Sequence, residues 1–300
     1  MLRFLPYPLR GIISLFIVAA NTLLWCSLLF LVAFFKYLLP ARVGRRLLDP
    51  VINQFATFWV TCNSAWLRWA TPTQWMVEGA EALTYDNWYL VNCNHQSWVD
   101  IFVLQNTLNR RIPLLKFFLK QELIYVPVIG LAWWALDFPF MKRHSRDALR
   151  KNPALRNQDR ESARRACAKF AHVPTSVMNF AEGTRFTPQK HATQASPYRH
   201  LLKPKTGAIA MALEAMGSQF QALVDVTIAY PDGIPSFWDY VSGRVRRVVV
   251  RIRLLDIPPE LRQGDYEQDR ALRKAFARWI DEIWAKKDQD LEEMLVIGKR

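Results

Sequence analysis

The segment VNCNHQSWVD, residues 91 to 100, places a histidine and an acid close together. His95 follows Asn94 and stands five positions before Asp100. An apolar, β-prone run precedes the segment and a new apolar run follows it, which indicates a turn between a strand and a helix. A carboxylate on one imidazole nitrogen fixes the tautomer of the ring and leaves the other nitrogen free as a base. The segment therefore predicts a histidine that removes a proton from a hydroxyl group.

The spacing of the two residues limits where they can meet. Residues five positions apart in a regular helix lie about 140° apart around its axis, so they face different sides. The pair can meet if His95 lies in the turn before the helix and Asp100 lies in its first turn. The alternative is a histidine that only caps or packs. The pair alone is suggestive, and it is accompanied by two further segments.

The second segment is NFAEGTRF, residues 179 to 186. It follows an apolar run and is expected at the end of a strand, where α/β proteins place their sites. Glu182, Gly183, Thr184 and Arg185 provide an acid, a flexible link, a hydroxyl and a guanidinium in succession. Arginine is suited to bidentate contacts with phosphate. The alternative is a surface turn with an incidental ion pair.

The third segment is KQELIYVPVIGLAWWALDFPFMKR, residues 120 to 143. Lys120 begins it, an apolar run from Val126 to Leu136 follows, and Lys142 and Arg143 end it. The run is too short to span a bilayer but is suited to lie against lipid or to line an acyl groove. A buried core helix is the alternative, and the flanking cations favour the lipid interface.

The net charge of +14 predicts an anionic partner, either nucleic acid, anionic lipid or a phosphorylated substrate. Basic residues concentrate between Lys142 and Lys169, and this region is either a solvated helical face or a surface pressed against anionic lipid headgroups. This region lacks interleaved aromatic residues and any nucleic-acid motif, so nucleic acid is not predicted as a partner. The four cysteines are far apart, which argues against a metal site and a disulfide framework and favours a reducing compartment.

The N-terminal run from Gly11 to Phe35 contains no charged residue and is long enough to cross a bilayer. It lacks the short apolar region and the cleavage site of a signal peptide, so we expect it to anchor the chain in a membrane. Asn21 and Thr22 stand in its middle, which leaves open a single span or a shallow hairpin in one leaflet. The positive cluster after the run places the remaining chain on the cytoplasmic side.

Alternating strand and helix patterns predict an α/β fold with a mixed central sheet flanked by helices. An N-terminal hydrophobic helix or helical hairpin anchors this fold to the membrane. We expect a membrane-anchoring helical region over residues 1–70 and an α/β domain over residues 71–300. A turn followed by a strand is predicted over TPTQWMVEG, residues 71–79, and further strands are predicted near 88–93, 175–180, 222–230 and 244–256. Helices are predicted over 47–70, 98–109, 144–172 and 266–294.

The three segments, in this order, resemble the motifs of the glycerolipid acyltransferase family, the 1-acyl-glycerol-3-phosphate acyltransferases. The family's NHxxxxD motif is matched by Asn94, His95 and Asp100, and its FPEGTR motif by Phe180 and Glu182 to Arg185. Ala181 stands where that motif usually has proline. The family's middle motif is matched by residues 120–123, Phe140 and Arg143, and the resemblance covers roughly residues 75–235. The segments DVTIAYPD, FMKR and LLKPKTGAI look more like the lysocardiolipin acyltransferase branch and the bacterial YihG-type proteins.

The resemblance implies transfer of a fatty acyl group from an acyl thioester to the free hydroxyl of a lysophospholipid such as lysophosphatidic acid. The thioester is that of coenzyme A or of acyl carrier protein, and no other cofactor and no metal is implied. His95 is the expected base and Asp100 its orienting acid. Substrate contacts are implied for the other matched positions: Asn94, Lys120, Arg143, Glu182, Gly183, Thr184 and Arg185.

Within this set, Lys120, Arg143 and Arg185 are expected to hold the phosphate of the acceptor. Glu182 is expected to bind a glycerol hydroxyl or an arginine. No G-x-S-x-G elbow and no cysteine in an activating motif is present, which favours direct attack of the hydroxyl on the thioester. The resemblance also implies a bacterial inner-membrane protein with its catalytic domain on the cytoplasmic face. Two alternatives are an acyltransferase that remodels another lysolipid and a membrane-anchored protein that binds anionic lipid without turnover.

Overall fold

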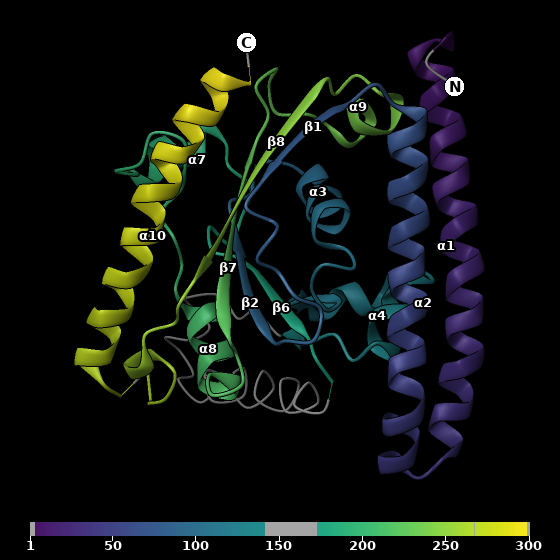
Figure 1. Ribbon diagram of the computed structural model, residues 1–300, viewed down its shortest axis with the longest axis horizontal. Helices are drawn as coiled ribbons and strands as arrows, with labels where there is room; N and C mark the ends of the chain where they lie inside the picture. Colours follow the sequence, from purple (N-terminus) through teal and green to yellow (C-terminus); the bar gives the residue numbers. More distant parts are fainter. Residues whose placement is uncertain (1–3, 142–172, 267, 299–300) are drawn as a thin grey trace.

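The computed structural model describes residues 4–141, 173–266 and 268–298, and Figure 1 shows its layers. Two long helices form one side of the molecule, a sheet lies in the middle, and a third long helix covers the opposite face. The predicted α/β fold with a mixed sheet is confirmed. The predicted helix over 144–172, the basic cluster between Lys142 and Lys169, and Arg143 lie outside the described residues.

The N-terminal region is a helical hairpin of α1 (Tyr7–Leu38) and α2 (Ala41–Ala70). The chain reverses at Leu39 and Pro40. A proline lacks an amide hydrogen and disfavours the helical conformation of the residue before it, and Leu39 is extended with φ −87° and ψ 154°. The predicted helix over 47–70 is confirmed. It begins earlier than predicted, at Ala41, directly after Pro40.

The apolar run from Gly11 to Phe35 lies within one continuous helix, so no turn interrupts it at Asn21 and Thr22. These two polar residues bind α2 instead. The Asn21 side-chain amide donates to the backbone oxygen of Trp59 at 3.1 Å and to Asn63 Oδ1 at 2.8 Å, while Trp59 Nε1 donates to Thr22 Oγ1 at 3.0 Å. The run therefore does not fold into a shallow hairpin of its own, and the hairpin consists of the two helices α1 and α2.

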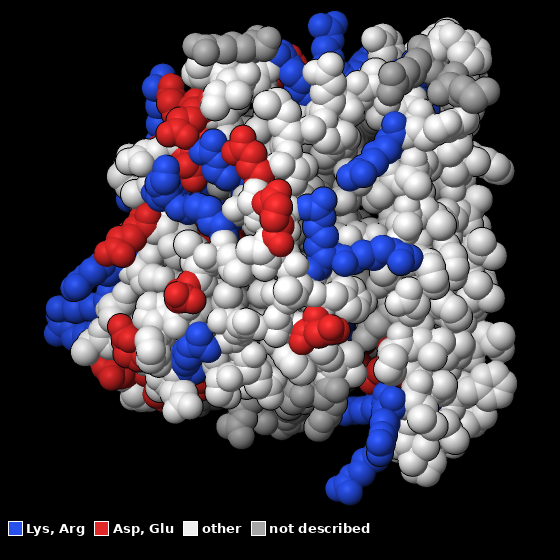
Figure 2. Space-filling model, viewed as in Figure 1, with Lys and Arg blue, Asp and Glu red and all other residues white. Residues whose placement is uncertain are grey.

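The outer face of α1 is apolar, and this helix is long and apolar enough to cross a membrane. Figure 2 shows almost no charge along the right-hand edge of the molecule, where α1 lies, whereas acids and bases gather over α10 and the sheet. The exposed large apolar residues of α1 include Ile12, Phe16, Leu23, Leu24, Leu31, Phe34 and Phe35. This face has the composition of a surface that contacts lipid.

The six-stranded sheet has the order β1-β8-β7-β2-β6-β3, with β7 and β8 antiparallel and the other neighbours parallel. Its strands are β1 (Gln74–Glu78), β2 (Tyr89–Cys93), β3 (Leu115–Phe117), β6 (Ser176–Phe180), β7 (Ala222–Ala229) and β8 (Arg247–Leu255). Every residue of β2 and β7 is buried, as expected for central strands covered on both faces. The five predicted strands are confirmed, and short β3 adds a sixth.

Helices cover both faces of the sheet. On the side of the hairpin lies α3 (Val99–Leu108), and on the opposite side lie α8 (Gly207–Met216) and α10 (Arg270–Ile297) (Figure 1). The predicted helices over 98–109 and 266–294 are confirmed. Shorter helices were not predicted: α7 (Pro188–Gln194), α9 (Phe237–Ser242) and the 3-10 turn η4 (Pro259–Leu261).

The third segment folds into β4 (Leu119–Lys120), the 3-10 turn η2 (Gln121–Tyr125), α4 (Ile129–Ala135) and β5 (Phe140–Met141). It lies against α1, where the Trp134 ring stacks on Tyr37 with 5.0 Å between centroids. Tyr125, Leu131 and Trp134 are exposed. The segment therefore extends the apolar surface of α1.

The hairpin is joined firmly to the sheet. Only Thr71 to Thr73 connect α2 to β1, and the Thr73 hydroxyl donates to the Val245 backbone oxygen at 2.8 Å. Near the other end of α1, Lys36 is buried and its Nζ lies 2.7 Å from Asp49 and 3.1 Å from Asp137. Buried charges are stable only when paired, so this cluster holds α1, α2 and the end of α4 in one arrangement.

Candidate active site

His95 and Asp100 meet at the carboxyl end of the central strands. His95 lies in the turn between β2 and α3, and Asp100 lies in the first turn of α3. The ring nitrogen Nδ1 of His95 is 2.9 Å from Asp100 Oδ2. The His95 side chain is 13% exposed and that of Asp100 is 1% exposed. The histidine thus reaches the surface of the site while the acid lies beneath it.

The Asp100 carboxylate accepts three further hydrogen bonds. Its Oδ2 accepts from the backbone N–H groups of Gln96 at 2.6 Å and Ser97 at 2.8 Å, and its Oδ1 accepts from the Tyr230 hydroxyl at 2.7 Å. Because each of these partners donates, the acid acts only as an acceptor and Nδ1 of His95 carries the proton. Among residues 4–141, 173–266 and 268–298, no hydrogen bond to the other ring nitrogen, Nε2, is present, so its lone pair can serve as a base.

Tyr230 was given no role by the sequence patterns. It directly follows β7, the strand that pairs with β2 in parallel. The predicted strand over 222–230 could therefore have placed Tyr230 at the same edge of the sheet as His95. Burial, and then the nearby charge of Asp100, raise the pKa of the Tyr230 hydroxyl well above its usual value. The hydroxyl therefore stays protonated and remains a donor to Asp100.

Glu182 lies fully buried between two loops. One carboxylate oxygen accepts from the His95 backbone N–H at 2.7 Å, and the other accepts from the Leu202 backbone N–H at 3.0 Å. Both oxygens are occupied by backbone donors beneath the surface of the site. This placement differs from the predicted contact with a glycerol hydroxyl or an arginine, because the acid ties the His95 turn to the segment at Leu202.

Asn94 is also fully buried and faces β7. Its side-chain amide donates to the Ile228 backbone oxygen at 2.9 Å, and its side-chain oxygen accepts from the Ile228 backbone N–H at 2.9 Å. The amide thus continues the pairing of β2 with β7 beyond the end of the strand. This placement differs from the predicted substrate contact and fixes the backbone just before His95.

The predicted turn from Glu182 to Arg185 lies beside the His95 turn. Gly183 has a φ of +66°, a conformation that residues with a side chain rarely adopt, and it allows the chain to fold back. The Phe186 backbone N–H then donates to the His95 backbone oxygen at 2.7 Å. Arg185 is exposed, with its guanidinium carbon 4.9 Å from the centre of the Trp98 ring. The structure thus brings the first and second segments together.

Two lysines that the sequence patterns did not single out accompany Arg185. Lys190 Nζ donates to the Thr184 hydroxyl at 2.8 Å and to the Arg185 backbone oxygen at 3.0 Å. Lys205 passes so close to Gly183 that a side chain on that glycine would meet Lys205 Cδ at 3.0 Å. Neither lysine was predicted as a site residue, and the contacts in the fold place both beside this turn.

The ring of His95 lies on an apolar surface. It stacks on Phe180 with 3.9 Å between centroids and 15° between planes, and Phe180 in turn stacks on Phe117 at 6.3 Å. Lys120 lies three residues beyond Phe117, exposed at the end of β4. Lys120 is therefore near the same edge of the sheet, whereas Arg143 lies outside the described residues.

The comparison with known families agrees with this geometry. The family model described as Acyltransferase matches residues 74–231, which is more than half of the chain. The chain belongs to the Acyltransferase family. The match contains both the His95–Asp100 pair and the turn from Glu182 to Arg185.

Among curated members of this family, the 1-acyl-sn-glycerol-3-phosphate acyltransferase gamma of Mus musculus is 26% identical over 222 residues, covering 68% of this chain and 52% of that protein. The delta protein of Homo sapiens is 26% identical over 226 residues, covering 70% and 53%. The chain thus spans about half the length of the curated relatives it matches. A solved structure with similarity is the 1-acyl-sn-glycerophosphate acyltransferase PlsC from Thermotoga maritima, with 19% identity, a TM-score of 0.49, and coverage of 93% of this chain and 98% of that one.

The buried Glu182 makes the stability of this family member depend on pH. Burial raises the pKa of Glu182 to about 8 from its ordinary 4.5, against the opposing effect of its two N–H donors. Between pH 4.5 and about pH 8, the Glu182 side chain is protonated in the folded protein and ionised in the unfolded chain. The contribution of Glu182 to the free energy of unfolding is therefore fully present below about pH 4.5 and is lost as pH rises to about 8. The slope of this loss is up to about 1.4 kcal/mol per pH unit.

We expect the Tm of the wild type to fall from pH 5 to pH 8 more steeply than the Tm of Glu182→Gln, measured in detergent. The glutamine variant is uncharged throughout and lacks this contribution, so the difference between the two curves reports the acid alone. Parallel curves would show that Glu182 is already ionised in the folded protein at pH 5.

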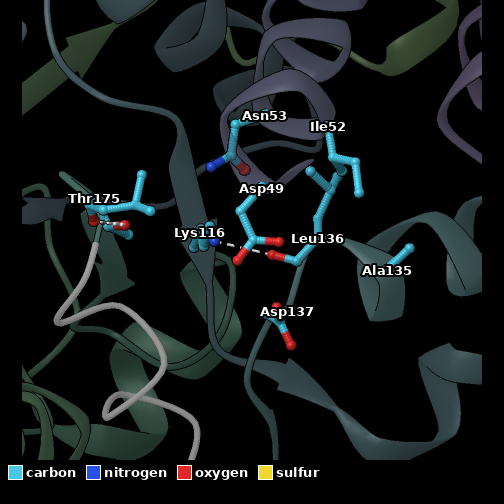
Figure 3. A pocket seen from close by; sticks show the side chains of 9 residues that line it. Asp49, Ile52, Asn53, Lys116, Ala135, Leu136, Asp137 and Thr175 are labelled. Atoms are coloured by element: carbon cyan, nitrogen blue, oxygen red, sulfur yellow. Dashed lines mark hydrogen bonds between the residues drawn. The ribbon is translucent and has the colours of Figure 1, made fainter. Parts of the chain in front are cut away.

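A small pocket lies at the opposite end of the sheet from His95 in this acyltransferase-family fold. Figure 3 shows Asp49 and Asn53 of α2, Lys116 of β3 and Thr175 before β6 around it, with Lys116 Nζ donating to the Leu136 backbone oxygen at 2.9 Å. It includes none of the predicted site residues. Within residues 4–141, 173–266 and 268–298, no cluster of three or more His, Cys, Asp or Glu side chains is arranged to hold a metal ion.

Proposed function

We propose that this protein transfers a fatty acyl group from an acyl thioester to the free hydroxyl of a lysophospholipid such as lysophosphatidic acid. The observation that carries the proposal is the His95–Asp100 pair, at 2.9 Å, which uses one ring nitrogen of the histidine and leaves the other to act as the base. The named activity of the curated relatives supports the same class of reaction. An oriented base of this kind has no use in a protein that only binds lipid.

In this mechanism, Nε2 of His95 removes the proton from the acceptor hydroxyl as its oxygen attacks the thioester carbonyl. Asp100 stabilises the imidazolium that forms. When the carbonyl re-forms, the carbon–sulfur bond breaks and the thiolate takes the proton from His95. The products are the acylated lipid and free coenzyme A or acyl carrier protein, and the histidine returns to its starting state.

Direct attack of the hydroxyl is supported by the state of the nearest cysteine. Cys93 lies two residues before His95 and is fully buried. Burial raises the pKa of its thiol well above the usual value, so it is not a thiolate at neutral pH. A covalent acyl-enzyme on this cysteine is therefore not part of the proposal.

The phosphate of the acceptor is assigned to the cations around the turn from Glu182 to Arg185. Arg185 is exposed beside the His95 turn, and Lys190 and Lys205 flank it. Lys120 and Arg143 join this set in the proposal, as the sequence resemblance implies. Gly183 and Thr184 shape the turn that presents Arg185. In the same proposal Asn94 and Glu182 hold the two loops in place.

We assign residues 1–70 to membrane anchoring and residues 71–300 to the catalytic domain, on the bacterial inner membrane with the catalytic domain at its cytoplasmic face. The continuous apolar face of α1 and the exposed aromatic residues of α4 support this arrangement. The acceptor is itself a membrane lipid, so an anchored enzyme meets it within the bilayer.

The experiment is acyl transfer by the purified full chain in detergent, using radiolabelled acyl-coenzyme A and acyl carrier protein as parallel donors. Lysophosphatidic acid and lysocardiolipin are offered as separate acceptors. We expect labelled product from the wild type with lysophosphatidic acid and none from His95→Ala. Label on lysocardiolipin alone would assign the chain to the branch that its DVTIAYPD and FMKR segments resemble.

Two results would overturn the proposal. Equal product from the wild type and His95→Ala would show that the histidine is not the base. Binding of anionic lipid without product from any donor and acceptor pair would favour the lipid-binding alternative.

A further inference from the structure

The segment from Tyr198 to Leu202 lies along α10 and is held by its side chains. The Asp288 carboxylate accepts from the backbone N–H groups of Arg199 and His200, each at 2.8 Å. The His200 ring is 2.7 Å from Glu292 Oε2. Side chains of the C-terminal helix make these three contacts with a stretch of chain that has no regular secondary structure of its own. The side chains of His191 and Ser196 make further contacts with its backbone oxygens.

Trp284 of α10 contacts the same segment that Glu182 ties to the His95 turn. It is fully buried, and its indole N–H donates to the Leu202 backbone oxygen at 3.0 Å. The N–H of the same residue, Leu202, donates to Glu182, whose other oxygen accepts from the His95 N–H. Three successive hydrogen bonds therefore connect the indole of α10 to the backbone of His95.

The helix is itself fixed to the centre of the sheet one turn further on. Lys287 is fully buried, and its Nζ lies 3.0 Å from Asp225 Oδ1 and donates to the backbone oxygen of Val226 and, at 3.2 Å, to the hydroxyl of Thr227. All three partners belong to β7, the strand that also supports Asn94. The position of Trp284 is thus set relative to the strands that carry the site.

We propose that Trp284 is a positioning residue for acyl transfer, acting through Leu202 and Glu182 on the backbone of His95. This inference rests on the proposed function. The helix α10 lies beyond residue 231, where the family match ends. The family motifs therefore contain the base and the acid, whereas a helix outside these motifs fixes the position of the turn that carries His95.

The test is Trp284→Phe, which removes the indole N–H and keeps an aromatic ring, with Trp279→Phe as the matched control. Trp279 lies on the same helix and packs on the ring of Phe276, whereas the hydrogen bond to Leu202 comes from Trp284. Loss of one hydrogen bond predicts a fall in kcat of about two- to tenfold in Trp284→Phe, with both KM values changed by less than about twofold. Trp279→Phe is expected to keep the wild-type kcat.

A second measurement reports the contact itself. Amide hydrogen exchange at Leu202, followed in the detergent-solubilised full chain, is expected to accelerate in Trp284→Phe and to stay unchanged in Trp279→Phe. Asp288→Ala loosens the same segment without leaving a cavity in the core. It is expected to accelerate exchange at residues 199–202 and to lower kcat in the same direction.

The outcomes separate this inference from the proposed function. An equal fall of kcat in both tryptophan variants, a change in KM in place of kcat, or faster exchange at Leu202 with wild-type kcat would each overturn the positioning role. Unchanged exchange at Leu202 in Trp284→Phe would overturn the contact on which it depends. If the wild type transfers no acyl group, the proposed function is wrong and so is the role of Trp284 in catalysis. The exchange data would then test only the hydrogen-bonded connection from Trp284 through Leu202 to Glu182.

Discussion

Replacing Asp100 by asparagine is expected to lower kcat for acyl transfer by about two to four orders of magnitude, the range of general-base assistance. The side-chain oxygen of asparagine can still accept from Gln96, Ser97 and His95 at the place of Oδ2. Its amide group would then face the Tyr230 oxygen, which can accept. The geometry is retained but the negative charge that stabilises the imidazolium is lost.

The measurement is kcat and both KM values for Asp100→Asn, His95→Ala and the double variant. The two single variants are expected to lose similar activity and the double variant little more, because the two residues act as one unit. Asn is a good residue near a helix start, so the Tm should change little. An Asp100→Asn enzyme with wild-type kcat would restrict Asp100 to a structural role and leave His95 to act alone.

Replacing Arg185 by alanine is expected to raise the KM of the acceptor by about ten- to a hundredfold, with little change in the KM of the thioester. Loss of one charge-assisted contact costs about 1.5–3 kcal/mol, which corresponds to this factor. The side chain is exposed and its guanidinium rests on the exposed Trp98 ring, so its removal does not disturb the core. Steady-state kinetics with each substrate varied in turn provides the measurement.

Arg244→Ala is the matched control for this variant. Arg244 also lies over an aromatic ring, that of Tyr7 at 5.7 Å, but it belongs to the hairpin side of the molecule. It should leave both KM values unchanged. A rise in the thioester KM of Arg185→Ala would assign this arginine to a phosphate of coenzyme A or of the carrier protein.

The candidate site residues were predictable because the combination of their types and their order along the chain is rare. The turn between a strand and a helix followed from the change of pattern at Asn92 to His95, and it allowed His95 and Asp100 to meet across five positions. The end of the strand at Phe180 likewise placed the turn from Glu182 to Arg185 at the same edge of the sheet. Local sequence was sufficient for both because each depends on one strand and the residues after it.

The roles of the buried acid and amide were not predictable, because their partners are distant in the sequence. Glu182 binds Leu202, and Asn94 binds Ile228 of another strand. Tyr230 reaches Asp100 only because β7 lies next to β2. A motif indicates which side chains belong to the site. Whether such a side chain binds substrate or holds a loop depends on the backbone groups that the fold places beside it.

The three-residue connection from Thr71 to Thr73 has a consequence for how substrate arrives. A connection of three residues joins α2 to β1, and the contacts of Lys36 with Asp49 and Asp137 hold α1 at its other end, so the hairpin is attached at both ends to the rest of the fold. If residues 1–70 anchor the chain as proposed, we expect these attachments to hold His95 at one distance from the bilayer surface. Under the proposed function, the acceptor would then reach His95 by diffusion within the bilayer. Turnover is expected to respond to the mole fraction of lysophospholipid in the membrane and not to its bulk concentration.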